Sequence, residues 1–197
     1  MYRSLEELCR MERETGKPFW KIVQEDDCVE QGISAEESFA QMRGMYQAMQ
    51  YADAHYDETL KSASGLVGTE GTRMKRAREA GTLLCGDFIG KVMEKALKTS
   101  ESNACMKRIV AAPTAGSCGV VPAVFLSVQE ERGFSEECMV EALYVAAGIG
   151  GGNGGSGGTV TIHGGNVTAS GGQDAAGIGD GYSGSGGSFA TGTDGHA

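Results

Sequence analysis

Glycine is distributed so unevenly along this 197-residue chain that its two ends cannot fold by the same rules. Residues 1–147 hold 12 of the 32 glycines, whereas residues 148–197 hold 20. All Lys and Arg residues lie at or before Arg132, and all six Cys at or before Cys138. Glycine loses more backbone entropy on folding than any other residue and has no side chain to bury. We therefore predict one domain over residues 1–150 and a glycine-rich tail over residues 151–197, either β-repeat-like or disordered.

The first part of the chain carries the start signals and the apolar periodicity of α-helices. Ser-x-x-Glu capping boxes at Ser4 and Ser34 predict two helix N-termini. Apolar residues three or four apart follow Ser34 and predict one long helix with a single buried face. This apolar stripe consists of Phe39, Met42, Met45, Tyr46, Met49, Ala52, Tyr56 and Leu60. Its methionines fit an ordinary helix core, with an adaptable binding groove as the alternative.

Three more helices are expected before the tail. A second apolar stripe contains Ile89, Val92, Met93, Ala96 and Leu97. Another helix is predicted over residues 119–128, with Pro122 tolerated in its first turn. Ser135 and the two glutamates after it predict the start of a helix that ends near Ala147. No period-2 strand pattern is evident in residues 1–147, so the predicted fold class is mainly α.

Composition excludes several classes of protein. A net charge of −9 without a basic cluster argues against nucleic-acid binding. No apolar run reaches the ~18 residues of a membrane span, and the N-terminus lacks the apolar core of a signal peptide. Six Cys without a Cys-x-x-Cys pair suit reduced thiols. We expect a cytoplasmic protein that binds neither nucleic acid nor membrane.

Three segments of small, polar residues interrupt the helical pattern and are candidate ligand-binding loops, at residues 64–71, 100–104 and 112–119. The third leads directly into a predicted helix. A helix N-terminus presents unpaired N–H groups and partial positive charge, so it suits a carboxylate or a phosphate. Thr114 and Ser117 would add hydroxyl donors. A tight turn between two helices is the alternative interpretation.

Other catalytic patterns are weaker. The histidines are His55, His163 and His196, and only His55 lies within the helical part. A Ser/His/Asp or Cys/His catalytic pair would therefore need His55 as its base. Cys85 and Cys118 lie near predicted helix starts, where a thiol can be activated, although a small buried apolar role is the preferred interpretation. Neither a metal-ligand spacing nor a Walker loop is present.

Residues 103–122, which include Ala-Pro-Thr-Ala-Gly-Ser at 112–117, closely resemble the alpha subunit of bacterial iron–sulfur-dependent L-serine dehydratase (L-serine ammonia-lyase). The Ser-Gly-Leu-Val-Gly motif at 64–68 and the helical segment at 142–150 match that family in order and spacing. The resemblance covers residues 2–150. It implies a helical serine dehydratase alpha-type domain.

The resemblance also implies a reaction, a cofactor and a partner. Members of the family convert L-serine to pyruvate and ammonia with a [4Fe–4S] cluster, which three cysteines hold so that one iron stays open to substrate. A beta subunit or domain completes the enzyme. The substrate-binding positions carried over are Ser64, Gly65, Asn103, Pro113, Thr114, Gly116 and Ser117. No residue is identified as the base that removes the α-proton.

One departure from the family concerns the cluster ligands. In the family the three cluster cysteines follow the stretch that matches residues 147–150, whereas this chain has no cysteine after Cys138. No metal ligand is therefore assigned, and the six cysteines are expected on scattered helices: Cys9, Cys28, Cys85, Cys105, Cys118 and Cys138. We expect a truncated enzyme segment that is inactive alone.

The tail has a pattern of its own. Residues 159–170 predict two short β segments around a Gly-Gly-Asn turn. Residues 146–160 align with residues 175–189 at an offset of 29, a repeat resembling the glycine-rich β repeats of bacterial surface proteins. Ala-Ala-Gly-Ile-Gly at 146–150 belongs to both the helical pattern and the repeat. This overlap suggests a chimera, produced either by recombination or by wrongly joined sequence.

Two alternative functions remain open on the sequence alone. The glycine repeat could be the active part of a surface or binding module, which would require export from the cell. A pyridoxal phosphate-dependent dehydratase would need a Schiff-base lysine. The candidates for it are Lys75, Lys91 and Lys107, which we expect on helix surfaces.

Overall fold

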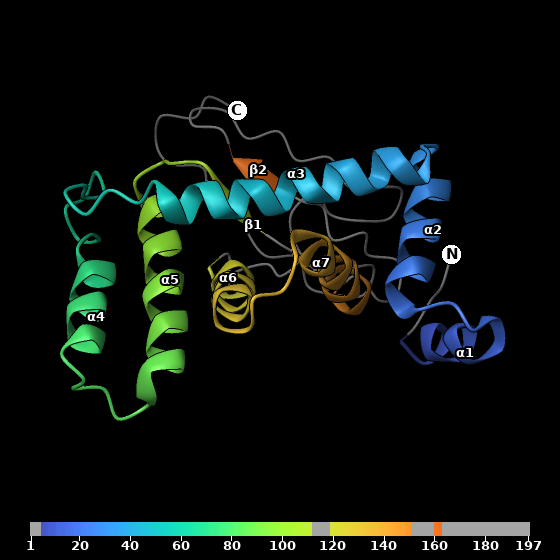
Figure 1. Ribbon diagram of the computed structural model, residues 1–197. Helices are drawn as coiled ribbons and strands as arrows, with labels where there is room; N and C mark the ends of the chain where they lie inside the picture. The colour runs from blue at the N-terminus through green and yellow to red at the C-terminus, as the bar shows by residue number, and fades with distance from the viewer. Residues whose placement is uncertain (1–4, 112–118, 151–159, 163–197) are drawn as a thin grey trace.

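The computed structural model describes residues 5–111, 119–150 and 160–162. These residues are mainly helical, as predicted (Figure 1). The helices are α1 (Leu5–Thr15), α2 (Phe19–Gln31), α3 (Ala35–Ala54), α4 (Glu70–Glu79), α5 (Gly86–Ala104), α6 (Val120–Arg132) and α7 (Glu136–Gly150). The strands are β1 (Ile109–Ala111) and β2 (Val160–Ile162).

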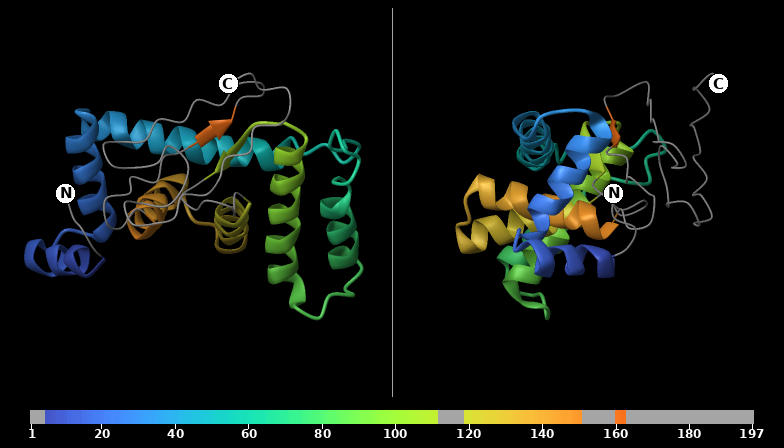
Figure 2. Two further views of the ribbon diagram at one scale, coloured as in Figure 1. Left: turned by 180° about the vertical axis from the view of Figure 1, so that it is seen from behind. Right: turned by 90° about the vertical axis from the view of Figure 1, so that its right-hand side faces the viewer.

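The long helix α3 lies across one side of the molecule, and the other helices lie beneath it (Figures 1 and 2). Helices α4 and α5 run antiparallel, side by side, at one end, while α1 and α2 lie at the other end. Helices α6 and α7 fill the space between the two ends. Helix α3 therefore carries the chain from the end formed by α1 and α2 to the end formed by α4 and α5 (Figure 1).

The hydrophobic core lies mainly between α2, α3 and α7. The ring centroids of Trp20, Phe39 and Tyr144 are 6.3–6.5 Å apart, within the range of favourable aromatic contacts. Tyr144 is 1% exposed, and its hydroxyl lies 2.7 Å from the Ser38 hydroxyl. Met49 is buried in the same core, so the methionine stripe of α3 is core rather than an open groove.

The predicted helix starts are confirmed wherever they lie in the described residues. At Ser34 both halves of the capping box form: the Glu37 N–H donates to the Ser34 hydroxyl at 3.2 Å, and the Ser34 N–H donates to the Glu37 carboxylate at 2.9 Å. The Ser135 hydroxyl accepts the N–H of Cys138 at 3.2 Å, at the start of α7. Pro122 lies in the first turn of α6. Ser4 lies outside the described residues.

The predicted end of the long helix is wrong. Helix α3 ends at Ala54, with His55 as its C-cap, so Tyr56 and Leu60 lie beyond it. The apolar spacing continues by chance into a turn. Beyond the helix the Tyr56 hydroxyl bonds to a carboxylate of α5, a tertiary contact that no helical period reveals.

The prediction that residues 1–147 lack a strand is also wrong. Strand β1 pairs with β2 in an antiparallel register in which Ile109 is opposite Ile162 and Ala111 is opposite Val160. A strand of three residues is too short to show alternation. Residues 160–162 belong to the first predicted β segment of the tail, but their partner is β1; the second predicted segment lies outside the described residues.

Helix α5 is built around buried ion pairs. Glu94 accepts a hydrogen bond from Arg78 of α4 at 2.9 Å. Lys95 pairs with Asp53 of α3 and, at 2.8 Å, with Glu130 of α6. Burial alone would raise the pKa of Glu94, but its hydrogen-bonded cations lower that pKa below the ordinary value. These pairs join α5 to three neighbouring helices.

No helix in the described part of the chain combines the length and the apolar character needed to cross a membrane.

Candidate functional site

The first predicted ligand-binding segment is an ordered turn between α3 and α4. The Ser62 N–H donates to the Val67 carbonyl at 2.9 Å, and the Gly65 N–H donates to the Ser62 carbonyl at 2.8 Å. The Ser64 hydroxyl lies 3.1 Å from the Ser62 hydroxyl. Gly65 has a φ of 71°, a conformation that favours glycine. Ser64 and Gly65 are therefore exposed at the tip of a turn with its own hydrogen bonds.

Glu101 of α5 binds the chain on both sides of this turn. Its carboxylate accepts the backbone N–H of Gly71 at 2.8 Å and the hydroxyl of Tyr56. The Tyr56 hydroxyl also lies 3.3 Å from the Thr72 hydroxyl. Glu101 is only 4% exposed, and hydrogen bonds to a buried carboxylate are stronger than neutral ones. Burial, followed by the hydrogen bond to Glu101, raises the pKa of Tyr56 to about 12.

Two glycines allow the segment to lie this close to its neighbours. Gly68 has a φ of 141°, and a Cβ there would lie 2.5 Å from the Leu60 carbonyl oxygen. A Cβ on Gly71 would lie 2.8 Å from the side chain of Lys98. Gly68 and Gly71 thus allow close packing, and Gly71 allows it against α5.

The second predicted segment is not a loop. Residues 100–104 form the last turn of α5, and Asn103 lies there, two residues after Glu101. The composition of this stretch suggests a loop, yet Glu101 and Ser102 are buried, so tertiary packing keeps it helical. The Asn103 carbonyl accepts the Met106 N–H at 2.9 Å. Asn103 and the turn that carries Ser64 are consequently attached to the same end of α5.

The third predicted segment lies between two described anchors. Residues 112–118, with Pro113, Thr114, Gly116 and Ser117, are outside the described residues. Strand β1 precedes them and contacts α5. Gly119 follows them as the N-cap of α6, and a Cβ on Gly119 would lie 2.5 Å from the Ala96 carbonyl oxygen of α5. The chain therefore enters and leaves this segment beside α5.

A cavity of about 410 Å³ lies beside the turn that carries Ser64 and Gly65. Its lining residues are Glu58, Thr59, Thr69, Thr72, Arg73 and Arg76. Thr69 has a φ of 83°, which a β-branched residue rarely adopts. The hydroxyls and guanidinium groups of this wall give the end of the molecule formed by α4 and α5 a polar, partly cationic surface.

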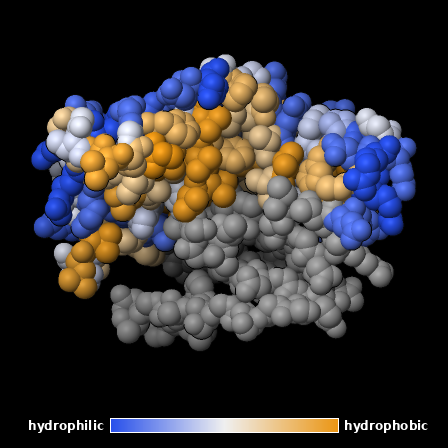
Figure 3. All heavy atoms as spheres, turned by 90° about the horizontal axis from the view of Figure 1, so that it is seen from below, coloured by the Kyte–Doolittle hydropathy of each residue, from blue (hydrophilic) through white to orange (hydrophobic). Residues whose placement is uncertain are grey.

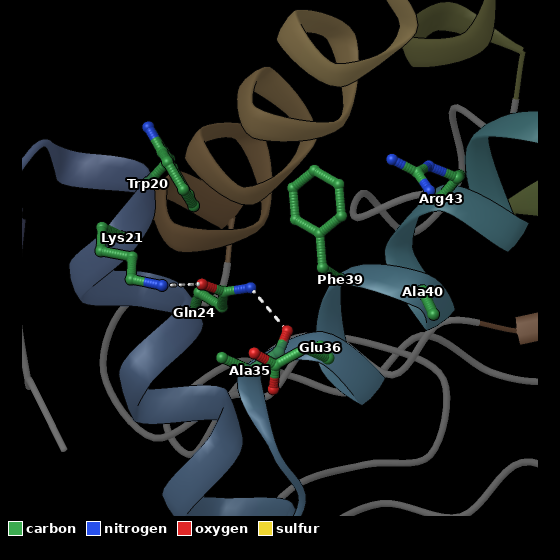
Figure 4. Close-up of a pocket in the computed structure, with 8 residues that line it drawn as sticks. All are labelled: Trp20, Lys21, Gln24, Ala35, Glu36, Phe39, Ala40 and Arg43. Atoms are coloured by element: carbon green, nitrogen blue, oxygen red, sulfur yellow. Dashed lines mark hydrogen bonds between the residues drawn. The ribbon is translucent and has the colours of Figure 1, made fainter.

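A second cavity, of about 370 Å³, lies between α2 and α3 at the opposite end of the molecule (Figure 4). The Gln24 side chain there accepts a hydrogen bond from Lys21 at 2.7 Å and donates one to the Ala35 carbonyl at 3.0 Å. Arg43 lies over the Phe39 ring, 5.2 Å from its centroid. None of the predicted site residues lines this cavity.

The structure also places the candidate residues for other kinds of catalysis. His55 stacks on Tyr51 with ring centroids 3.8 Å apart, and its Nδ1 lies 2.9 Å from the Tyr51 carbonyl oxygen. Cys85, expected to be buried, is exposed at the N-cap of α5. Lys107, expected on a helix surface, lies between α5 and β1. Cys118, His163 and His196 are outside the described residues.

The described cysteines are scattered over the fold: Cys9 on α1, Cys28 on α2, Cys85 and Cys105 at opposite ends of α5, and Cys138 on α7. Within the described residues, no three His, Cys, Asp or Glu side chains come close enough together to hold a metal ion. This part of the chain therefore does not fit an iron–sulfur cluster.

Sequence reasoning missed the residues that hold the site together. The predicted helix face includes Tyr56 and a predicted loop includes Glu101, whereas the two side chains form one hydrogen bond between α5 and the chain after α3. A usable signal was present on α5: Glu94, Lys98 and Glu101 recur at helical spacing, which predicts one polar face and hence polar partners.

Comparison with known proteins agrees with the resemblance seen in the sequence. The family described as "Serine dehydratase alpha chain" matches residues 14–185, a range that includes part of the glycine-rich tail. The "Probable L-serine dehydratase, alpha chain" of Bacillus subtilis is 31% identical over 155 residues, covering 76% of this chain and 50% of the relative. The "L-serine dehydratase, alpha chain" of Peptoniphilus asaccharolyticus is 29% identical over 152 residues, covering 76% of this chain and 52% of that relative.

The chain thus spans about half the length of the curated relatives it matches. No solved structure is significantly similar to it. The family match extends over most of the sequence and includes every described helix and strand except residues 5–13 of α1. On this basis the chain belongs to the serine dehydratase alpha chain family.

Proposed function

We propose that this chain supplies substrate-binding segments of an L-serine dehydratase, a lyase that converts L-serine to pyruvate and ammonia. The observation that carries the proposal is the double attachment through Glu101, which accepts hydrogen bonds from Gly71 and Tyr56. It joins the turn with Ser64 and Gly65 to the end of α5 that carries Asn103. The turn and Asn103 belong to two separate segments that resemble the family, and the buried Glu101 carboxylate connects these segments.

The reaction explains why such segments are needed. The α-proton leaves Cα and the hydroxyl leaves Cβ, and the resulting enamine tautomerises to an imine. Water then replaces the nitrogen, which departs as ammonia. The substrate must be oriented through its carboxylate and amine throughout. The Ser64 hydroxyl suits the carboxylate, and the Asn103 amide oxygen suits the ammonium group. The N–H of Gly65 is bonded to the Ser62 carbonyl, so we propose that Gly65 serves by letting the substrate approach the backbone closely.

The segment before α6 is proposed to complete the carboxylate site. Helix α6 has 13 residues, and its N-terminus provides unpaired N–H groups and partial positive charge. The residues immediately before it include Pro113, Thr114, Gly116 and Ser117. Gly119 lies against Ala96 of α5, so the N-terminus of α6 contacts the helix that carries Asn103.

The cluster implied by the family resemblance would act as a Lewis acid on the substrate oxygens. The described residues do not fit it, and no step of the reaction is assigned to it here. We propose that the chain alone holds no cluster and makes no pyruvate. Iron and sulfide analysis after anaerobic purification tests this, and stoichiometric iron and sulfide would overturn it.

A complete enzyme is proposed to need a second chain. The curated relatives are named alpha chains, which supports a beta subunit or domain as partner. We propose the cytoplasm as its location, where thiols stay reduced. Co-purification of the tagged chain with the beta chain of its own source organism tests the partnership.

The tail beyond residue 150 is proposed to have been joined to the helical part at residues 146–150. Those residues fit both patterns in the sequence. The family match runs across this join to residue 185. A single uninterrupted gene would give the same match, so the match does not distinguish the two origins. Long-read sequencing of the source DNA across codons 140–160 tests the proposal, and an uninterrupted gene would contradict an assembly artefact.

A hybrid enzyme tests the proposed activity directly. Residues of this chain replace the matching half of the Bacillus subtilis alpha chain, and pyruvate formation from L-serine is measured together with that organism's beta chain. We expect activity, and we expect Ser64→Ala and Asn103→Ala each to lower kcat/KM about tenfold or more. Thr15→Ala, at an exposed hydroxyl on α1 at the opposite end of the molecule, is the matched control. An active hybrid that neither substitution affects would contradict the assignment of these residues.

A further inference from the structure

Helix α5 buries its charged face and exposes part of its apolar stripe. Glu94 and Lys95 are 4% and 7% exposed, whereas Ile89 and Met93 are 47% and 45% exposed. A helix at the surface of a complete globular domain ordinarily shows the reverse arrangement. The charged face is satisfied by ion pairs to α3, α4 and α6, so the orientation of α5 is fixed.

The neighbouring helix extends the exposed apolar surface. Val120 and Val124, one turn apart on α6, are 50% and 38% exposed. Helices α5 and α6 pack closely, because Gly119 allows the start of α6 to approach the backbone of Ala96. Figure 3 shows apolar side chains gathered over these neighbouring helices when the molecule is seen from below. We call Ile89, Met93, Val120 and Val124 the α5/α6 patch.

Such a patch needs an explanation. Single exposed apolar residues are common, but contiguous apolar surface on a soluble protein marks a contact with another polypeptide. The four side chains of the α5/α6 patch are 38–50% exposed, and none of them lines either of the two cavities described above. A surface of this kind fits a packed helix or sheet better than a small ligand.

We propose that the α5/α6 patch packs against the part of an alpha chain that the present chain does not match. The curated relatives carry that additional polypeptide: the matched region covers only 50% and 52% of their lengths. Segments of one chain bury apolar faces such as this one against each other. Because Val120 is the first residue of α6, the polypeptide on the α5/α6 patch would also border the start of that helix.

Cysteine labelling tests this without measuring activity. Met93→Cys and Val124→Cys are made in the full 197-residue chain and in the hybrid with the unmatched half of the Bacillus subtilis alpha chain. Alkylation rates at each position are followed by mass spectrometry. We expect rapid labelling in the chain alone and at least tenfold slower labelling in the hybrid. Val29→Cys is the matched control, because Val29 is 81% exposed on the distant helix α2, and its rate should not change.

Three results would overturn the proposal. Equal labelling of Met93→Cys in the chain and in the hybrid would show that the patch stays open. Protection that appears only when the beta chain is added would assign the patch to that partner. Protection in the chain alone that rises with its concentration would assign it to a second copy. If the hybrid does not fold, the same comparison uses the Bacillus subtilis alpha chain with cysteine at the position aligned with Met93.

Discussion

Tyr56 donates its hydroxyl hydrogen to the buried carboxylate of Glu101, a residue 45 positions further along the chain. The same carboxylate accepts the backbone N–H of Gly71. One side chain of α5 therefore holds the chain on both sides of the turn that carries Ser64 and Gly65. Ordinary turns are held by bonds within themselves, so this long-range attachment indicates that the position of the turn relative to α5 matters.

Removing the carboxylate should destabilise the fold. In Glu101→Ala the Gly71 N–H and the Tyr56 hydroxyl lose their acceptor in a buried place, which costs about 2–4 kcal/mol of unfolding free energy for the two groups together. Urea unfolding measures the change. Glu79→Ala, at an exposed residue of α4, should change the free energy by less than about 0.5 kcal/mol. Equal values for the two variants would contradict a structural role for Glu101.

The two glycines Gly68 and Gly44 should respond to alanine in opposite directions. Gly68→Ala places a Cβ 2.5 Å from the Leu60 carbonyl oxygen at a φ of 141°, so we expect a loss of about 3 kcal/mol. Gly44 lies in α3 with open space around it, so Gly44→Ala should gain about 0.5–1 kcal/mol. Thermal unfolding of both variants checks the pair. A Gly68→Ala variant as stable as the wild type would show that the turn can move away from Leu60.

The ion pairs of α5 predict a loss of stability in acid. Hydrogen bonds from Lys98 and Arg78 outweigh burial and lower the pKa of Glu94 from its ordinary value of 4.5. The stability that this carboxylate contributes is therefore complete above the unfolded-state pKa and is lost as the pH falls through the lower folded-state pKa. Urea unfolding between pH 7 and pH 3 should show a steeper acid decline for the wild type than for Glu94→Gln. Parallel declines would contradict this origin.

The parts of the fold that the sequence predicted depend on local signals. Ser34 and Glu37 form their capping box through contacts three residues apart, and Ser135 caps α7 in the same way. Such contacts are independent of the rest of the molecule. The helical fold class was predictable for this reason.

The errors occur where tertiary contacts override local pattern. Tyr56 continues an apolar spacing but belongs to a turn, where Glu101 binds its hydroxyl. Asn103 lies in a stretch of loop-like composition, yet the burial of Ser102 keeps it in α5. Strand β1 depends on a partner about 50 residues away, at Ile162. None of these partners can be identified from spacing alone.

The candidate site was predicted as three separate segments, and their attachment to one helix was not. The match at Ser64 and the match at Asn103 are each visible in the sequence, but the carboxylate that connects them belongs to a residue without a predicted role. The sequence predicts Gly119 as the end of the third segment and the start of a helix, but not its contact with Ala96 of α5.

The most direct test of this account is the effect of Tyr56→Phe on kcat/KM for L-serine in the hybrid alpha chain. The substitution removes only the hydroxyl that bonds to Glu101, and the ring can still pack. We predict a loss of about tenfold or more, with little effect of Tyr51→Phe, an exposed tyrosine on α3. An unchanged kcat/KM in a folded Tyr56→Phe hybrid would contradict the claim that this bond positions the substrate-binding segments.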